Sequence, residues 1–202
     1  MTKVTIDKSR LSIKELSLDT WKDFKRFHEG KEGTIEWKGC YCTYWEFMGS
    51  NEEWNKLTET RNPAIIEFKE SLVREGKTHG FLLYLENKPI AWMQYGHRSY
   101  FAKLNRYDRY QETAGDDVTS ITCFGVVKEY RKQGIARALL RMALEEFKRK
   151  GIKTVEGYPR KIASEQVESD DEVWQGPLSL FLSCGFEIYI DHERYPVIRK
   201  LL

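Results

Sequence analysis

The segment 124-FGVVKEYRKQGIARALL-140 has the residue types and the spacing needed to bind a phosphate group. It joins an apolar run to an amphipathic helix through a basic turn. The first N–H groups of a helix have no partner within it and form the positive end of its dipole. Gly134 leaves room for a phosphate near the backbone, and the surrounding charges come from Lys128, Arg131, Lys132 and Arg137. We predict a pyrophosphate cradle, with an ordinary turn carrying solvated basic side chains as the alternative.

Two better-known phosphate-binding motifs are excluded at this turn. A P-loop requires two spaced glycines followed by Lys and Ser or Thr, whereas Gly134 is followed by Ile-Ala-Arg. A dinucleotide fingerprint requires three glycines at fixed spacing, and Gly134 stands alone in the turn. The cradle therefore belongs to a different class of phosphate site.

The elements that must position this turn follow from apolar periodicity and from turn residues. Residues 118–127 are strongly β-prone, and apolar residues recur at helical intervals from Ile135 to Phe147. The other predicted strands are 11–16, 81–86, 90–97, 152–158, 186–190 and 195–201. The other predicted helices begin after Asp19 or Thr20, at Pro63 with Asn62 as N-cap, and at Pro177, the last ending at Cys184. A strand-helix-strand run beside a hairpin favours a mixed α/β sheet.

The sequence Arg131-Lys132-Gln133-Gly134-Ile135-Ala136 resembles the (Arg/Gln)-x-x-Gly-x-(Gly/Ala) motif of the GNAT N-acetyltransferase superfamily. The order of elements beyond residue 78 is also similar, and Cys184-Gly185-Phe186 stands where the family usually has its terminal Gly-Phe. The resemblance implies one domain over residues 1–202, with a mixed, mostly antiparallel sheet flanked by helices. Residues 1–77 would form a helical, aromatic acceptor side. Residues 78–202 would hold the hairpin, the cofactor motif and the C-terminal strands.

The resemblance further implies an acyltransferase that uses acetyl-CoA as its acetyl donor and transfers the acetyl group directly to an amine. Backbone groups of Phe124, Val126 and Val127 would pair with the pantetheine arm, and the amides of 132–136 would hold the pyrophosphate. The two strands before the helix at 177–184 would splay apart, opening the slot in which the reaction takes place. The full expected cofactor-binding set is Phe124, Gly125, Val126, Val127, Arg131, Lys132, Gln133, Gly134, Ile135, Ala136, Arg137 and Phe181.

The acid and the base are the least determined part of the expected site. Many family members have Tyr as proton donor where this chain has Phe181, so the role is absent, taken by water, or moved to Tyr158. The thiol of CoA has a pKa near that of cysteine, about 8.5, so loss of the donor need not abolish catalysis. Glu156, on the strand after the motif helix, and Glu46 are the candidate bases, each with an ordinary structural carboxylate as the alternative.

The stretch 39-GCYCTYWEF-47 is expected to line the acceptor side of the slot. Tyr41, Tyr44 and Trp45 would form an aromatic wall for an apolar or cationic acceptor, and His97 would lie near the slot; plain packing is the alternative.

Cys40 and Cys42, in the same stretch, also allow a metal or redox role. A zinc site usually needs four ligands, however, and the remaining cysteines, at positions 123 and 184, are isolated in the sequence. We therefore expect no metal.

Composition and charge restrict the partners. The 202 residues include 33 basic and 31 acidic side chains, a net charge of +2, so no overall field favours nucleic acid or a membrane. Aromatic and basic residues alternate in the loop at about 98–117, but neighbouring acids favour a cleft lid or a subunit contact, including a homodimer. The sequence shows no signal peptide or spanning segment, and its four cysteines suit a reducing cytoplasm. The remaining alternative is a non-catalytic acyl-CoA-binding protein of the same fold.

Overall fold

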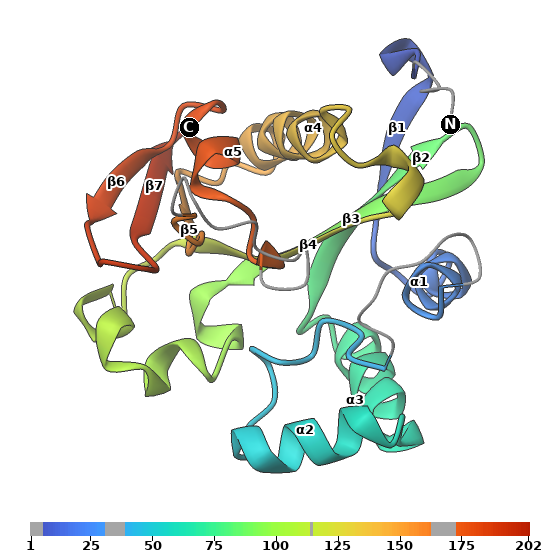
Figure 1. Ribbon diagram of the computed structural model, residues 1–202, viewed down its shortest axis with the longest axis horizontal. Coiled ribbons are helices and arrows are strands. Elements are labelled where there is room, and N and C mark those ends of the chain that lie inside the picture. The colour runs from blue at the N-terminus through green and yellow to red at the C-terminus, as the bar shows by residue number, and fades with distance from the viewer. Residues whose placement is uncertain (1–5, 31–38, 114, 163–172) are drawn as a thin grey trace.

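The computed structural model describes residues 6–30, 39–113, 115–162 and 173–202. Its strands form one sheet in the order β1-β2-β3-β4-β5-β7-β6 (Figure 1). The strands are β1 (Leu11–Glu15), β2 (His79–Leu85), β3 (Lys88–His97), β4 (Thr119–Val126), β5 (Thr154–Gly157), β6 (Glu187–Ile190) and β7 (Val197–Leu201). Within the described ranges, β4 and β5 are the parallel neighbours, and the other pairs are antiparallel. The expected mixed, mostly antiparallel sheet flanked by helices is confirmed.

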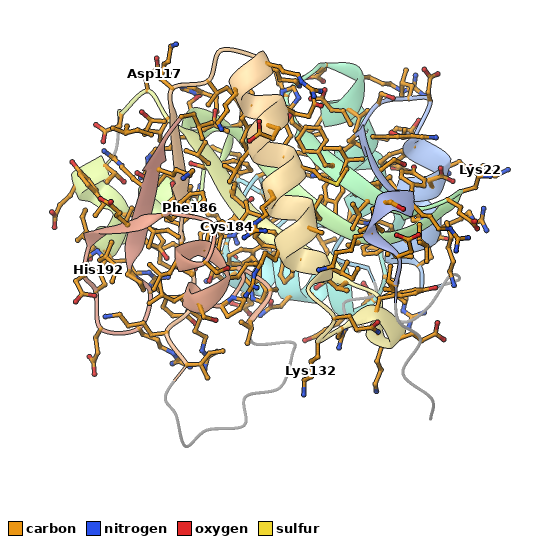
Figure 2. The ribbon with its side chains drawn as sticks, turned by 90° about the horizontal axis from the view of Figure 1, so that it is seen from above. Lys22, Asp117, Lys132, Cys184, Phe186 and His192 are labelled. Atoms are coloured by element: carbon orange, nitrogen blue, oxygen red, sulfur yellow. The ribbon has the colours of Figure 1, made fainter. Side chains whose placement is uncertain are left out.

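Helices cover both faces of this sheet (Figure 1). They are α1 (Trp21–His28), α2 (Asn51–Glu59), α3 (Pro63–Arg74), α4 (Ile135–Arg149) and α5 (Leu178–Leu182). On one face, apolar residues of α4 pack on Phe81 and Met93, and Figure 2 shows α4 crossing the sheet. On the other face, aromatic residues of α1 pack on Leu82 and Trp92. Because successive strand residues point to opposite faces, neighbouring positions in β2 and β3 supply both cores.

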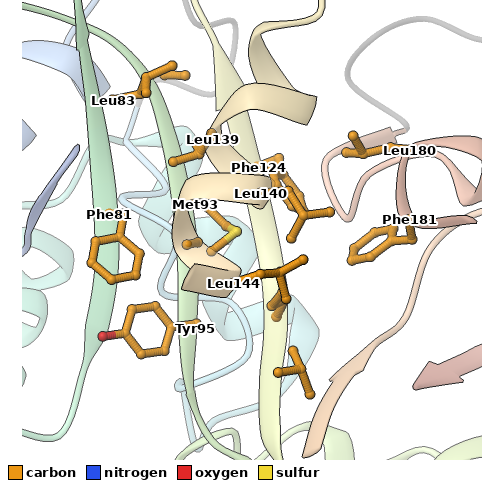
Figure 3. Close-up of a cluster of buried hydrophobic side chains, with 14 of the residues drawn as sticks. Phe81, Leu83, Met93, Tyr95, Phe124, Leu139, Leu140, Leu144, Leu180 and Phe181 are labelled. Carbon is orange, nitrogen blue, oxygen red and sulfur yellow. The ribbon is translucent and has the colours of Figure 1, made fainter. Parts of the chain in front are cut away.

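The larger core lies between α4 and the sheet (Figure 3). Leu139, Leu140 and Leu144 of α4 are almost completely buried there. Burying a leucine side chain contributes roughly 1.5–3 kcal/mol relative to leaving it exposed. This packing fixes α4 against β4, and so holds the N-terminus of α4 near the end of that strand.

Side-chain caps mark the starts of α2 and α3. Asn62 Oδ1 accepts a hydrogen bond from the Ala64 N–H, which confirms the predicted N-cap. Thr20 precedes α1 but makes no side-chain cap, because its hydroxyl donates to the Glu15 carbonyl. Helix α2 was missed, although Ser50 and Glu53 form a reciprocal capping box at its start.

The connections also differ in detail from the expectation. The β2–β3 turn lies one residue earlier than predicted, with Glu86 in the left-handed region at φ +57° and Lys88 already in β3. The predicted loop after β3 contains short 3-10 turns at Arg98–Tyr100, Leu104–Arg106 and Asp108–Thr113. No helix in the described ranges has both the length and the apolar character needed to cross a membrane.

Candidate functional site

The parallel strands β4 and β5 separate part way along their length. Their pairing runs from Thr119 to Ile121, whereas β4 continues to Val126. Residues 173–176, which we call the partition, lie beside β4 where β5 has left it. The Phe124 N–H donates to the Trp174 carbonyl at 2.7 Å, and the Gly176 carbonyl accepts from the Arg160 N–H at 3.2 Å. The expected splay is present, and a segment of the same chain spans it.

A cavity of about 530 Å³ lies on one side of the partition, between the end of β4 and the start of α4. Val173 and Gly176 of the partition line it. The expected cofactor-binding residues that line it are Phe124, Val126, Arg131, Lys132, Gly134, Ile135, Ala136 and Arg137. We call this space the cradle.

The start of α4 presents free backbone donors to the cradle. Gly134 is the N-cap, at φ +77° and without a side-chain cap, and Lys132 just before it is also left-handed, at φ +57°. The first intrahelical bond at this end comes from the Ala138 N–H to the Gly134 carbonyl, which leaves the preceding helical N–H groups without a helical acceptor. Figure 2 shows Lys132 at this end of α4. A Cβ on Gly134 would lie 3.3 Å from Lys8 Nζ, so Lys8, which the sequence analysis missed, adds a positive charge.

The end of β4 is partly engaged by the chain itself. Arg131 Nε donates to the Val126 carbonyl at 2.9 Å. The Val127 N–H donates to the Ile90 carbonyl at 3.0 Å, so this N–H faces β3 and not the splay. Gly125 faces Trp92 of β3 in the ladder. The backbone groups of β4 that face the splay are therefore those of Phe124 and Val126.

Phe181 lies in the core rather than in the cradle. It is fully buried, packs edge-on against Phe124 and contacts Phe186 (Figure 3). A Cβ on Gly157 would lie 2.9 Å from its ring. Leu180, its neighbour in α5, lines the cradle instead. Phe181 does not line the cradle, because its ring packs into the core beneath it.

A second cavity, of about 430 Å³, lies on the other side of the partition. Tyr44 packs edge-on against three indole rings, those of Trp45, Trp54 and Trp174, at centroid distances of 5.1, 5.1 and 5.6 Å. All four rings line the cavity, which we call the ring cavity. Sequence reasoning anticipated Tyr44 and Trp45. It missed Trp54 of α2 and Trp174 of the partition.

Tyr41 does not join this wall. Its ring packs near Phe24 and His28 of α1 instead. Tyr41 and Cys42 are both left-handed, at φ +43° and +49°. Non-glycine residues adopt this region at an energetic cost, and such residues cluster at functional sites. This turn is what directs Tyr41 toward α1 and Cys42 toward the sheet.

Three cysteines line the ring cavity: Cys40, Cys42 and Cys123. Cys123 is isolated in the sequence, but the fold brings its sulfur to 2.8 Å from that of Cys42. A hydrogen bond with Cys42 and burial raise the pKa of Cys40, and burial raises that of Cys42, so both thiols stay protonated and weakly nucleophilic. In the described residues, no group of three or more His, Cys, Asp or Glu side chains is arranged to hold a metal ion.

Glu156 is buried in a polar network and lines neither cavity. Its carboxylate accepts from Arg98 Nη1 at 3.0 Å and from Arg199 Nε at 2.7 Å. The Tyr158 hydroxyl donates to the same carboxylate at 2.5 Å, and burial raises the pKa of Tyr158 well above its ordinary value. Glu156, a candidate base, and Tyr158, a candidate proton donor, therefore lie in this buried network and not at the wall of either cavity. Two guanidinium groups hold the carboxylate beneath the sheet surface.

Glu46 is also paired away from the ring cavity. Its carboxylate accepts from Lys69 Nζ at 2.8 and 3.1 Å, and both side chains are almost completely buried. Lys69 Nζ also donates to the Thr78 hydroxyl at 2.8 Å. Since its cation partner lies within hydrogen-bonding distance, Glu46 ties the 39–47 stretch to α3.

His97 lies at the exposed end of β3. Its ring is 2.7 Å from the Ser99 hydroxyl, and its Nε2 is 3.3 Å from the Asp117 carboxylate. It lines neither the cradle nor the ring cavity. The expected position near the slot is not seen, because β3 extends past the splay before it reaches His97.

A family model matches the sequence of this chain. The model described as "Acetyltransferase (GNAT) family" matches residues 37–160, which is more than half of the chain. The match includes the 39–47 stretch, β4 and α4. A comparison with curated proteins found no significant match.

Solved structures show the same fold at low identity. The PaiA N-acetyltransferase of Thermoplasma acidophilum, in complex with coenzyme A, aligns with a TM-score of 0.53 and 13% identity over 95% of this chain and 99% of that one. The ribosomal-protein-S5-alanine acetyltransferase of Vibrio fischeri aligns with a TM-score of 0.51 and 11% identity, over 98% of this chain and 96% of that one. An uncharacterised protein of Bacillus halodurans aligns with a TM-score of 0.53 and 12% identity, over 95% of this chain and 83% of that one. At these identities the likeness shows the fold alone.

Proposed function

The chain belongs to the GNAT acetyltransferase family, and from this we propose that it transfers the acetyl group of acetyl-CoA directly to the amine of an acceptor. We also propose that residues 1–202 act as a single domain of this kind. One observation supports the proposal most. Phe124 and Val173 line the cradle and their chain neighbours Cys123 and Trp174 line the ring cavity, so the two cavities flank the hydrogen bond from the Phe124 N–H to the Trp174 carbonyl.

The cradle suits the diphosphate of the cofactor. Backbone N–H groups at the start of α4 would donate to the phosphate oxygens, and Gly134 keeps the approach free of a side chain. Lys132 and Arg137 line the same space and supply positive charge. The Phe124 N–H and Val126 would pair with the amide groups of the pantetheine arm.

The acceptor would enter through the ring cavity. A reacting amine must be neutral, so its proton has to leave before or during attack on the thioester carbonyl. Glu59, an exposed residue at the end of α2, lines this cavity and can pass a proton to solvent. We propose Glu59 as a proton acceptor. The roles predicted for Glu156, Glu46 and Tyr158 remain predictions, and their pairing favours structural roles.

The proposal is tested by release of free CoA. Purified protein with acetyl-CoA and a mixed panel of amines should release CoA only when an amine is present, and the acetylated amine should appear by mass spectrometry. Calorimetric binding of acetyl-CoA without turnover on any amine would instead favour a non-catalytic acyl-CoA-binding protein. Absence of both binding and turnover would refute the proposal.

The partition gives a spectroscopic prediction. If pantetheine takes the Phe124 N–H, the Trp174 carbonyl must leave it, and we expect the Trp174 ring to shift with its backbone. Acetyl-CoA is therefore expected to change the tryptophan emission of the protein, and most of the change should be lost in Trp174→Phe. Trp21→Phe, which removes an indole from the core around α1, should keep the change. An equal change in wild type and Trp174→Phe would contradict movement of the partition.

A further inference from the structure

The ring cavity has the shape and lining of a small-molecule site. Its volume of about 430 Å³ lies within the range of about 300–1,000 Å³ found for ligand pockets. The four rings around it would contact a flat apolar group through their faces and edges, as aromatic pairs do. No lysine, arginine or histidine is among the described residues that line it, and Glu59 is its one acidic residue there.

The floor of the cavity carries a hydrogen-bond donor that has no acceptor. Gln94 of β3 is completely buried and lines the cavity. Its Oε1 accepts from the Thr122 hydroxyl at 3.0 Å, which fixes the orientation of the amide. Its Nε2 has no hydrogen-bond partner among the described residues. Buried polar groups are almost always paired with protein, water or ligand, so a molecule that fills the ring cavity is expected to present an acceptor atom to this donor.

The ladder places this donor beside the reacting centre. Gln94 lies opposite Cys123 of β4, and Phe124 is the next residue along that strand. The Phe124 N–H is the group that faces the splay. An acceptor atom bound to Gln94 Nε2 must therefore lie close to the attacked thioester, and so close to the reacting amine.

The surroundings of Gln94 Nε2 indicate the charge of the ligand atom that accepts its hydrogen bond. A donor N–H disfavours an ammonium group beside it, and a neutral amine that accepted this hydrogen bond would use the lone pair it needs for attack on the thioester, so Gln94 binds a different atom from the reacting nitrogen. A carboxylate here would be buried without a cation among the described lining residues, which is costly. A neutral carbonyl satisfies the donor without this cost.

On the basis of the proposed function, we propose that the acceptor is a small aromatic α-amino carbonyl compound, such as an aromatic amino-acid amide or ester. Its ring occupies the space between Tyr44, Trp45, Trp54 and Trp174. Its carbonyl accepts the hydrogen bond from Gln94 Nε2, and the adjacent amine faces the splay. Gln94 is a specificity-determining residue, and Thr122 is a positioning residue that acts through it.

Three matched probes test this assignment in the full-length protein with acetyl-CoA. L-tryptophanamide has the ring, the amine and a neutral carbonyl, tryptamine lacks the carbonyl, and L-tryptophan has a carboxylate in its place. We expect kcat/KM for L-tryptophanamide to exceed that for each of the others by about tenfold or more, because an unpaired buried donor carries a desolvation penalty. Equal values for L-tryptophanamide and tryptamine would overturn the assignment while leaving the transferase function intact.

Variants identify the residue responsible. Gln94→Leu is expected to reduce the L-tryptophanamide:tryptamine ratio by about tenfold or more, to the value set by the different basicities of the two amines. Thr122→Val, which removes the hydroxyl that orients Gln94, should reduce the ratio partly, and Thr122→Ser, which keeps the hydroxyl, should preserve it. If Gln94 instead acts on the thioester, Gln94→Leu lowers kcat for both amines equally and the ratio persists, which refutes the inference.

The two proposals can fail separately. If no amine in the broad panel releases CoA, the proposed function falls. Calorimetric titration of L-tryptophanamide and tryptamine into the wild type and Gln94→Leu, in the presence of CoA, then tests the ring cavity alone. Tighter binding of the amide that depends on Gln94 supports the assignment. Equal or absent binding of both amines overturns it.

Discussion

Gly134→Asp is expected to weaken acetyl-CoA binding by at least about 100-fold, since each 1.4 kcal/mol is a factor of ten in affinity. The new carboxylate would stand where the phosphates approach the start of α4. Two negative charges about 4 Å apart near a protein surface repel by about 4 kcal/mol. Aspartate is a favoured helix N-cap and tolerates the left-handed region better than most residues, so α4 should persist. Isothermal titration calorimetry with acetyl-CoA measures the effect.

Gly151 offers a matched control on the same helix. It follows the other end of α4 at φ +73°, and a Cβ there would have no atom within 4 Å. Gly151→Asp therefore introduces the same residue at a similar backbone angle, away from the cradle. Its acetyl-CoA affinity should match that of the wild type. Unchanged affinity in Gly134→Asp would place the phosphates elsewhere.

Lys69→Met is expected to cause a large loss of stability. The substitution leaves the Glu46 carboxylate buried without its cation, and breaking a buried ion pair in this way costs about 3–5 kcal/mol. For a chain of this length, each 1 kcal/mol lowers the Tm by about 2–4 °C. Differential scanning calorimetry should therefore show a Tm lower by about 6–20 °C. Lys77→Met removes one side of an exposed pair with Glu75 and should leave the Tm nearly unchanged.

A double variant separates stability from chemistry. Glu46→Leu/Lys69→Met replaces both charges by apolar groups and is expected to regain much of the lost stability. If Glu46 only ties the 39–47 stretch to α3, this variant should turn over acceptors at near the wild-type rate. If the double variant folds but does not turn over, Glu46 becomes a candidate base again.

The cradle could be predicted from the sequence because its parts are contiguous. The strand, the basic turn, Gly134 and the amphipathic helix follow one another, so periodicity and one motif suffice to place them. The capping box at Ser50 and Glu53 was equally readable and would have revealed α2. Local signals of this kind depend on neighbouring residues alone.

The ring cavity and the buried networks could not be predicted in this way. Cys42 and Cys123 meet although 81 positions separate them, and Trp174 reaches Tyr44 from still farther along the sequence. Alternation along β5 gives the face of Glu156 but not its partners. Arg98 and Arg199 come from distant segments, and they convert a candidate base into a paired, buried carboxylate.

The partition also bears on the order in which two substrates enter. The ring of Trp174 lines the ring cavity, and its carbonyl accepts a hydrogen bond from the Phe124 N–H. This N–H is the group that we propose for pantetheine. A molecule resting against that ring stabilises the closed position of the partition, and linkage makes this effect reciprocal. If the protein transfers acetyl groups as proposed, its two substrates are expected to oppose each other's binding until the partition moves, and turnover is expected to begin with binding of the donor.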